Sequence, residues 1–198
     1  MISQKIEIYS PILKTKFLYH DLVKTQLLKN INETTNTAYK KIDNLTVDKM
    51  RNDFDESDNL ERKWLQNVLG FLQKHFNDCA KQIGFEDFKI INIWYQQYNP
   101  NGETHGWHTH GSNYTGVYYV DYDNQNGHTQ FLYPCNLKNG FEVNVQEGDL
   151  ILFPCNFIHR SAPNIRGDVK TIISFNLEIG KISPNTAPYD FYNIEKVY

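Results

Sequence analysis

The strongest indication of the fold lies in the stretch FKIINIWYQQYNPNGETHGWHTHGSNYTGVYYVDYD, residues 88–123. It is rich in Ile, Val, Tyr and Thr, and the turn sequence NPNG at 99–102 interrupts it. Such runs are typical of antiparallel strands, whose side chains point alternately to the two faces of a sheet. Further runs of this kind follow at 128–133, 141–145, 149–154 and 169–179. Short strands separated by turn sequences predict an antiparallel sandwich or barrel.

The chain has a different pattern before residue 86. After Asp21, the sequence LVKTQLLKN is typical of a short amphipathic helix. Between 59 and 84 apolar residues recur every three or four positions, which predicts one longer helix. Asp58 followed by Glu61 resembles a capping box, and Gly84 suits a helix end. We therefore predict a single domain over 1–198, with mainly helical support at 1–86, a strand-built core at 87–180 and a C-terminal tail at 181–198.

Composition narrows the class of protein. The chain has 198 residues, of which 40% are hydrophobic, so it can form a core and is not a disordered chain. Its net charge of −3 argues against a nucleic-acid partner. No apolar run approaches the roughly 20 residues of a membrane span, so we expect no membrane partner. The three cysteines have no CxxC spacing, which favours a reducing cytoplasm, or the host cytoplasm if the source is viral.

Three of the seven histidines fall within six residues, at positions 105, 108 and 110. Alternation along a strand places His108 and His110 on one face, and His105 on the other. Two imidazoles on one face can hold a metal ion when a third ligand comes from elsewhere. His159 is the best third ligand, because it follows an apolar strand that ends in Pro154. The alternative is that the pair consists of incidental surface histidines in a binding module without catalytic activity.

A second polar set lies on the strand VKTIISFNL, residues 169–177. Alternation places Lys170, Ile172, Ser174 and Asn176 on one face. This mixture of polar side chains is expected for a barrel interior that holds a polar ligand. A buried lysine is costly unless it is paired, and a cosubstrate with a carboxylate would pair it. The alternative is an edge strand with Lys170 in water. On the strand at 88–98, Tyr98 either donates a hydrogen bond inside the barrel or packs at the strand end.

The ordered set of these sequences resembles a known family. It consists of WYQQYNPNGETHGWHTHGSNYTGVYYV, then NGHTQFLYP, then VQEGDLILFPCNFIHRSAPNIRGDVKTIISFN. Together they are similar to the iron(II)- and 2-oxoglutarate-dependent oxygenases. The likeness is greatest to the small oxygenases of marine bacteria and phages that are related to prolyl 4-hydroxylases. It covers about residues 90 to 178, and the helical N-terminal part matches only in kind.

The resemblance implies a mainly β fold with N-terminal helices, built on a double-stranded β-helix of the jelly-roll, cupin-like type. It implies an Fe(II) ion, O2 and 2-oxoglutarate as a small-molecule cosubstrate. The metal ligands would be His108, His110 and His159. Lys170 would pair with the distal carboxylate, and Tyr98 and Thr115 fall where related enzymes place hydroxyl donors. Together with the polar side chains that share a face with Lys170, the candidate cosubstrate residues are Lys170, Tyr98, Thr115, Ser174 and Asn176.

The chain departs from the commonest ligand set at one position. Most such enzymes use two histidines and one carboxylate, whereas here His110 stands in the carboxylate position. The function that the resemblance implies is coupling of oxidative decarboxylation of 2-oxoglutarate to hydroxylation of a substrate that the sequence does not identify. Three-histidine sites also occur in cupin dioxygenases. The alternatives are therefore a cupin-like metal dioxygenase that does not use 2-oxoglutarate, or a jelly-roll binding module without catalytic activity.

Overall fold

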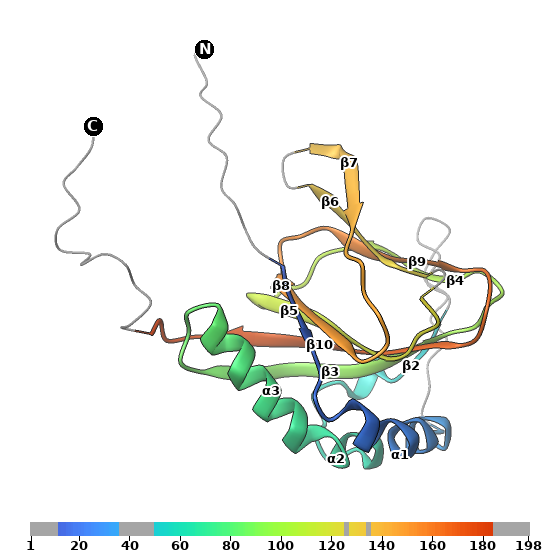
Figure 1. Cartoon of the computed structure of the whole chain (residues 1–198), viewed down its shortest axis with the longest axis horizontal. Coiled ribbons are helices and arrows are strands. Elements are labelled where there is room, and N and C mark those ends of the chain that lie inside the picture. The colour runs from blue at the N-terminus through green and yellow to red at the C-terminus, as the bar shows by residue number, and fades with distance from the viewer. Residues whose placement is uncertain (1–11, 36–49, 125–126, 134–135, 184–198) are drawn as a thin grey trace.

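Two antiparallel sheets form the centre of the molecule (Figure 1). The computed structural model describes residues 12–35, 50–124, 127–133 and 136–183, so most of the predicted tail lies outside the described residues. The larger sheet has the order β1 (Leu13–Lys16), β8 (Asp149–Pro154), β5 (Tyr114–Asp121), β10 (Lys170–Ile179), β3 (Phe88–Tyr98) and β2 (Arg51–Asn52). The smaller sheet has the order β4 (Glu103–His108), β9 (His159–Asn164), β6 (Thr129–Tyr133) and β7 (Asn136–Glu142).

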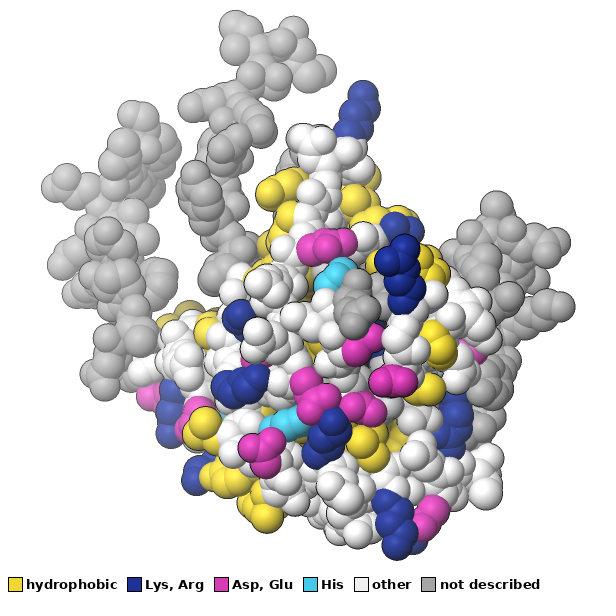
Figure 2. Space-filling view, turned by 45° about the vertical axis from the view of Figure 1, so that its right-hand side comes forward, with side chains coloured by type: hydrophobic (Ala, Val, Ile, Leu, Met, Phe, Trp, Pro, Cys, Tyr) yellow, Lys and Arg dark blue, Asp and Glu magenta, His cyan; other side chains and the backbone are white. Residues whose placement is uncertain are grey.

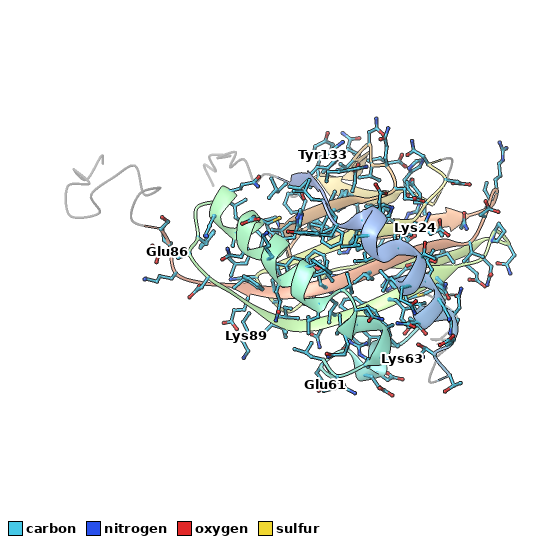
Figure 3. All side chains as sticks on the ribbon, turned by 60° about the horizontal axis from the view of Figure 1, so that its bottom comes forward. Lys24, Glu61, Lys63, Glu86, Lys89 and Tyr133 are labelled. Carbon is cyan, nitrogen blue, oxygen red and sulfur yellow. The ribbon has the colours of Figure 1, made fainter. Side chains whose placement is uncertain are left out.

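Helices cover the outer face of the larger sheet, away from the smaller one (Figures 1 and 3). They are α1 (His20–Asn32), α2 (Lys63–Gln66) and α3 (Leu69–Gln82), with a short 3-10 turn, η1 (Phe54–Glu56), before α2. Side chains fill the layer between helices and sheet, whereas Glu61 and Lys63 point away from it (Figure 3). This architecture is the predicted double-stranded β-helix with N-terminal helices.

The buried apolar side chains form two clusters, one between the helices and the larger sheet and one between the two sheets, and strand β10 contributes to both. Ile173, Phe175 and Leu177 are buried in the cluster that also contains the helical side chains. Ile172 belongs instead to the cluster between the two sheets. The alternation read from the sequence is therefore confirmed, because one face of the strand packs on helices and the other faces the barrel interior.

The predicted helix at 59–84 is wrong in its extent, because two helices, α2 and α3, occupy this range with a break at residues 67–68. The predicted capping box is also wrong, since the residue before α2 is Arg62 and no side chain caps that helix. The predicted end at Gly84 is confirmed. This residue has a φ of 93°, and the Phe85 N–H donates to the Ala80 carbonyl at 2.9 Å, which closes the helix in a Schellman motif.

Other differences from the predictions concern where strands end and which strands form. Strand β4 ends at His108, so His110 lies just beyond the strand rather than within it. Strand β7 spans Asn136–Glu142, so the predicted strand at 141–145 both starts and ends too late. Strands β1, β2 and β9 were not expected. The first two are edge strands of four and two residues, which are too short to show a clear alternation of apolar and polar residues.

Acidic and basic side chains are interspersed on the face of the molecule shown in Figure 2. On the described surface, Lys24 forms ion pairs with Asp121 at 2.8 Å and with Glu147 at 2.7 Å. Within the described residues no helix combines the length and apolar character needed to cross a membrane.

Candidate metal centre

Three histidines converge between the sheets. His108 is the last residue of β4, His110 follows two residues later, and His159 is the first residue of β9. Antiparallel pairing sets His108 opposite His159, so neighbouring strands bring together residues that are far apart in the sequence. The Nε2 atoms of His110 and His159 are 3.3 Å apart, and one nitrogen from each ring lies within 4.8 Å of the others. The structure thus brings together the three predicted metal ligands.

Backbone carbonyls orient two of these rings. His108 Nδ1 lies 2.7 Å from the Gly106 carbonyl, and His159 Nδ1 lies 3.0 Å from the Phe157 carbonyl. A carbonyl only accepts, so each Nδ1 carries the proton and each Nε2 keeps its lone pair. Donation from the second ring nitrogen to a carbonyl is the usual way in which proteins orient a metal-binding histidine.

Burial keeps two of the three histidines neutral. Burial, followed by the nearby His108, lowers the pKa of His110 to about 4. Burial holds the pKa of His159 well below its usual range, with His108 as the next cause. Neutral imidazole is the form that binds a transition metal, so these rings are ready to act as ligands at neutral pH. Among the described residues, the group that can hold an ion contains three histidines and no carboxylate.

A small cavity adjoins the histidines. Aromatic rings surround the cluster. The Phe153 ring lies 4.8 Å from His159, and the Trp94 ring lies 6.0 Å from His110. Polar side chains from both sheets also line the cavity, namely Gln96, Tyr98, His105, Thr115, Thr129, Ser161 and Ser174. The site therefore combines three candidate metal ligands with a polar cavity between the two sheets.

Lys170 lies behind two residues of the cavity lining, Ser161 and Tyr98. Its Nζ donates to Ser161 Oγ at 2.7 Å and to the Gly127 carbonyl, and it lies 4.7 Å from the centre of the Tyr98 ring. Lys170 is only 2% exposed, and no carboxylate of the described residues pairs with it. Burial lowers the pKa of Lys170 to about 7. A cation in this setting is unstable unless an anion reaches it.

The other predicted cosubstrate residues occupy different places. Tyr98 is directly opposite Lys170 in the register of β3 and β10. Ser174 and Thr115 line the cavity, but Ser174 donates to Gln96 Oε1 at 2.8 Å and Thr115 donates to the Phe175 carbonyl at 2.9 Å. Asn176 pairs with Asn92 at 3.4 Å. It lies six residues along the strand from Lys170, which is roughly 20 Å. The structure therefore groups Tyr98 with Lys170 and separates Asn176 from both.

Ser161 and Gln96 are among the cavity residues that sequence reasoning missed, and it gave His105 no role. Ser161 had a usable signal, because it lies two residues after His159 and alternation places both on one face of β9. Gln96 and His105 meet across the cavity from different sheets, with Gln96 Nε2 and His105 Nδ1 3.3 Å apart. No local sequence pattern reports such a contact. Burial, followed by the neighbouring His108 and His110 and by Lys170, lowers the pKa of His105 to about 3.

Comparison with solved structures places the fold among 2-oxoglutarate oxygenases. A prolyl hydroxylase from Trichoplax adhaerens, solved with a peptide fragment of hypoxia inducible factor, matches with a TM-score of 0.62 and 14% identity, over 85% of this chain and 83% of that one. The non-heme alpha-ketoglutarate-dependent epimerase SnoN from nogalamycin biosynthesis matches with a TM-score of 0.65 and 9% identity, over 90% and 81%.

A third match is HygX from Streptomyces hygroscopicus, solved with nickel and 2-oxoglutarate bound. It has a TM-score of 0.59 and 9% identity, over 88% of this chain and 85% of that one. A scan against protein-family models finds no match to the sequence, and a search of curated proteins finds none either. At these identities the comparisons establish a shared double-stranded β-helix fold.

Proposed function

We propose that this protein is a non-haem Fe(II) enzyme that couples oxidative decarboxylation of 2-oxoglutarate to hydroxylation of a substrate still to be identified. One observation carries the proposal. Three histidines converge beside the cavity, and a buried lysine without a carboxylate partner among the described residues contacts Ser161 and Tyr98 in the cavity lining. A metal ion fits the first group, and the free end of a dicarboxylate fits the second.

The donor set suits iron, since imidazole nitrogen is a common ligand of iron, zinc and copper in proteins. Three neutral histidines leave the double positive charge of the ion uncompensated. A dianionic cosubstrate would place one carboxylate at the ion, which compensates half of that charge, and its other carboxylate at Lys170. When bound, the iron would supply the redox chemistry by which O2 converts 2-oxoglutarate to succinate and CO2 and hydroxylates the substrate. HygX, which shares this fold, was solved with nickel and 2-oxoglutarate bound.

The protein's own residues have binding and positioning roles in this proposal. His108 and His159 present Nε2 because the carbonyls of Gly106 and Phe157 hold their Nδ1 protons. Lys170 would hold the distal carboxylate, and Ser161, which already contacts its Nζ, would be the nearest hydroxyl. Asn176 lies farther from Lys170 than one cosubstrate molecule can span, so we assign it no cosubstrate contact.

The test is to add Fe(II) and 2-oxoglutarate to the protein without oxygen and to record the visible spectrum. A metal-to-ligand charge-transfer band is expected, and succinate should form once air is admitted. A protein that gives neither the band nor succinate is not a 2-oxoglutarate oxygenase. A protein that in addition binds no divalent metal would be the jelly-roll binding module.

The third histidine favours a second candidate, a cupin-like dioxygenase that does not use 2-oxoglutarate, because it replaces the usual carboxylate. A Lys170→Met variant separates the two enzymes. The oxygenase should lose most of its affinity for 2-oxoglutarate while still binding metal, whereas the cupin-like enzyme should keep its activity. Lys89→Met removes an exposed lysine and is the matched control.

A further inference from the structure

Each of the three candidate ligands packs against a ring that is not itself a ligand. The centres of the His159 and Phe153 rings are 4.8 Å apart, and those of the His110 and Trp94 rings are 6.0 Å apart. For His108 the partner is His105, whose ring is stacked on it with centres 3.9 Å apart and planes 25° apart. His105 does not belong to the group that can hold an ion. It is therefore the fourth histidine of the cavity, with a place in the packing but no place among the ligands.

A chain of two hydrogen bonds from the other side of the cavity reaches the His105 ring. The amide of Gln96 lies 3.3 Å from His105 Nδ1, and Ser174 Oγ donates to Gln96 Oε1 at 2.8 Å. Because Oε1 accepts from Ser174, the Gln96 Nε2 group is left to donate to His105. Gln96 is on β3 and Ser174 on β10, both in the larger sheet, whereas His105 is on β4 in the smaller sheet. The chain of contacts thus links the two sheets next to the histidine cluster.

Strand β4 has an irregular pairing. Within the described part of the chain it is an outer strand of the smaller sheet, paired with β9 alone. The register shifts twice along it, between Glu103 and His105 and again between His105 and His108. Irregularities of this kind disrupt the ladder locally and change the direction of side chains. Backbone pairing alone therefore constrains the direction of the His108 side chain less than it would in a regular ladder.

We propose that His105 is a positioning residue of the metal centre: anchored by Gln96, its ring orients the His108 ring toward His110 and His159. The inference rests on the proposed function only in requiring that a divalent ion binds these histidines. A histidine suits the position because its flat ring stacks on His108 while its edge nitrogen accepts the hydrogen bond from Gln96. A phenyl ring would supply the stacking without the anchor.

Cobalt(II) is a suitable probe, since its visible absorption reports ligand geometry and its binding needs neither cosubstrate nor turnover. The unmodified protein, His105→Ala and Gln96→Leu would each be titrated with Co²⁺. Loss of an outer-shell partner typically weakens metal binding by 10- to 100-fold, and we expect both variants to lose about that much and to show an altered spectrum. His128→Ala is the matched control, because His128 contacts Tyr122 and lies outside the histidine cluster. Circular dichroism checks folding.

His105→Phe preserves the bulk of the ring and covers the case in which the alanine variant does not fold. It should bind Co²⁺ more weakly than the unmodified protein and more tightly than a folded His105→Ala. Unchanged affinity and spectrum in His105→Ala would overturn the proposal, as would unchanged binding in Gln96→Leu. A loss in His105→Ala as large as in His108→Ala would make His105 a ligand and would also overturn it. If the unmodified protein binds no Co²⁺, the proposed metal centre itself is wrong.

Discussion

Replacing Lys170 with methionine should change how the free energy of unfolding depends on pH. Lys170 is fully buried, and its hydrogen bonds go to a hydroxyl and a carbonyl rather than to a carboxylate of the described residues. Methionine has a similar length and no charge, so it removes the ionisable group with little change of volume. In the absence of cosubstrate, the buried cation therefore destabilises the folded state of the unmodified protein, and the variant lacks this cost.

The magnitude follows from the pKa. Burial lowers the pKa of Lys170 from 10.5 to about 7, which corresponds to a penalty of roughly 5 kcal/mol on the charged form. Below pH 7 the lysine is protonated in both states, so the full penalty applies and does not vary with pH. Between about pH 7 and 10.5 the unfolded chain binds more protons than the folded one, so stability rises with pH. Between pH 7 and 9 this group should add roughly 2 kcal/mol.

Urea unfolding at pH 6, 7, 8 and 9, without metal or cosubstrate, measures this effect. At each pH, the free energy of unfolding of Lys170→Met is subtracted from that of the unmodified protein. This subtraction cancels the contributions of the other titrating groups. The difference should be constant from pH 6 to nearly 7 and should then move by roughly 2 kcal/mol in favour of the unmodified protein by pH 9. The exposed Lys89→Met control should run parallel to the unmodified protein. Parallel curves for Lys170→Met as well would refute the reasoning, because Lys170 would then be solvated or paired in the folded state.

Three further predictions concern the scaffold. Gly116→Ala should destabilise the fold by at least about 3 kcal/mol in a urea titration, because a Cβ there would lie 2.3 Å from a backbone carbonyl of β8. Asp53→Asn should cost about 3–5 kcal/mol in the same assay, since it leaves the buried Arg62 guanidinium, now 2.6 Å away, without its counter-ion. Burial raises the pKa of Cys79 to about 11, so its thiol should be alkylated far more slowly at pH 8 in the native than in the urea-unfolded protein, as measured by peptide mass spectrometry.

Much of the fold follows from local periodicity. The strand at 88–98 was predicted with the bounds that the structure has, and the alternation on β10 correctly separated helix-facing from cavity-facing side chains. Periodicity failed where long-range contacts determine the structure. The break between α2 and α3 gives no signal of its own in the helical pattern. Trp64 on α2 is instead held by a 2.7 Å hydrogen bond to Asp53, the residue immediately before η1.

The candidate site also has a part that local sequence features predicted and a part that depends on long-range contacts. His108, His110, His159 and Lys170 were identified from residue type and spacing, because metal ligands and a buried cation are chemically distinctive. Asn176 was grouped with Lys170 on the correct ground that they share a face, but a shared face says nothing of distance along a strand. The register with β3 sets Asn176 against Asn92 and Lys170 against Tyr98, at separate ends of the barrel.

Strand alternation is enough to assign side chains to the barrel interior, because it is a local property of the backbone that the sequence carries. The sequence also supplied the chemical groups of the site. Only the tertiary structure set His108 opposite His159, left Lys170 without a carboxylate partner among the described residues, and joined His105 on one sheet to Gln96 on the other. These relations depend on strand register and on how two sheets pack, which arise from contacts between residues far apart in the chain and so leave no local pattern.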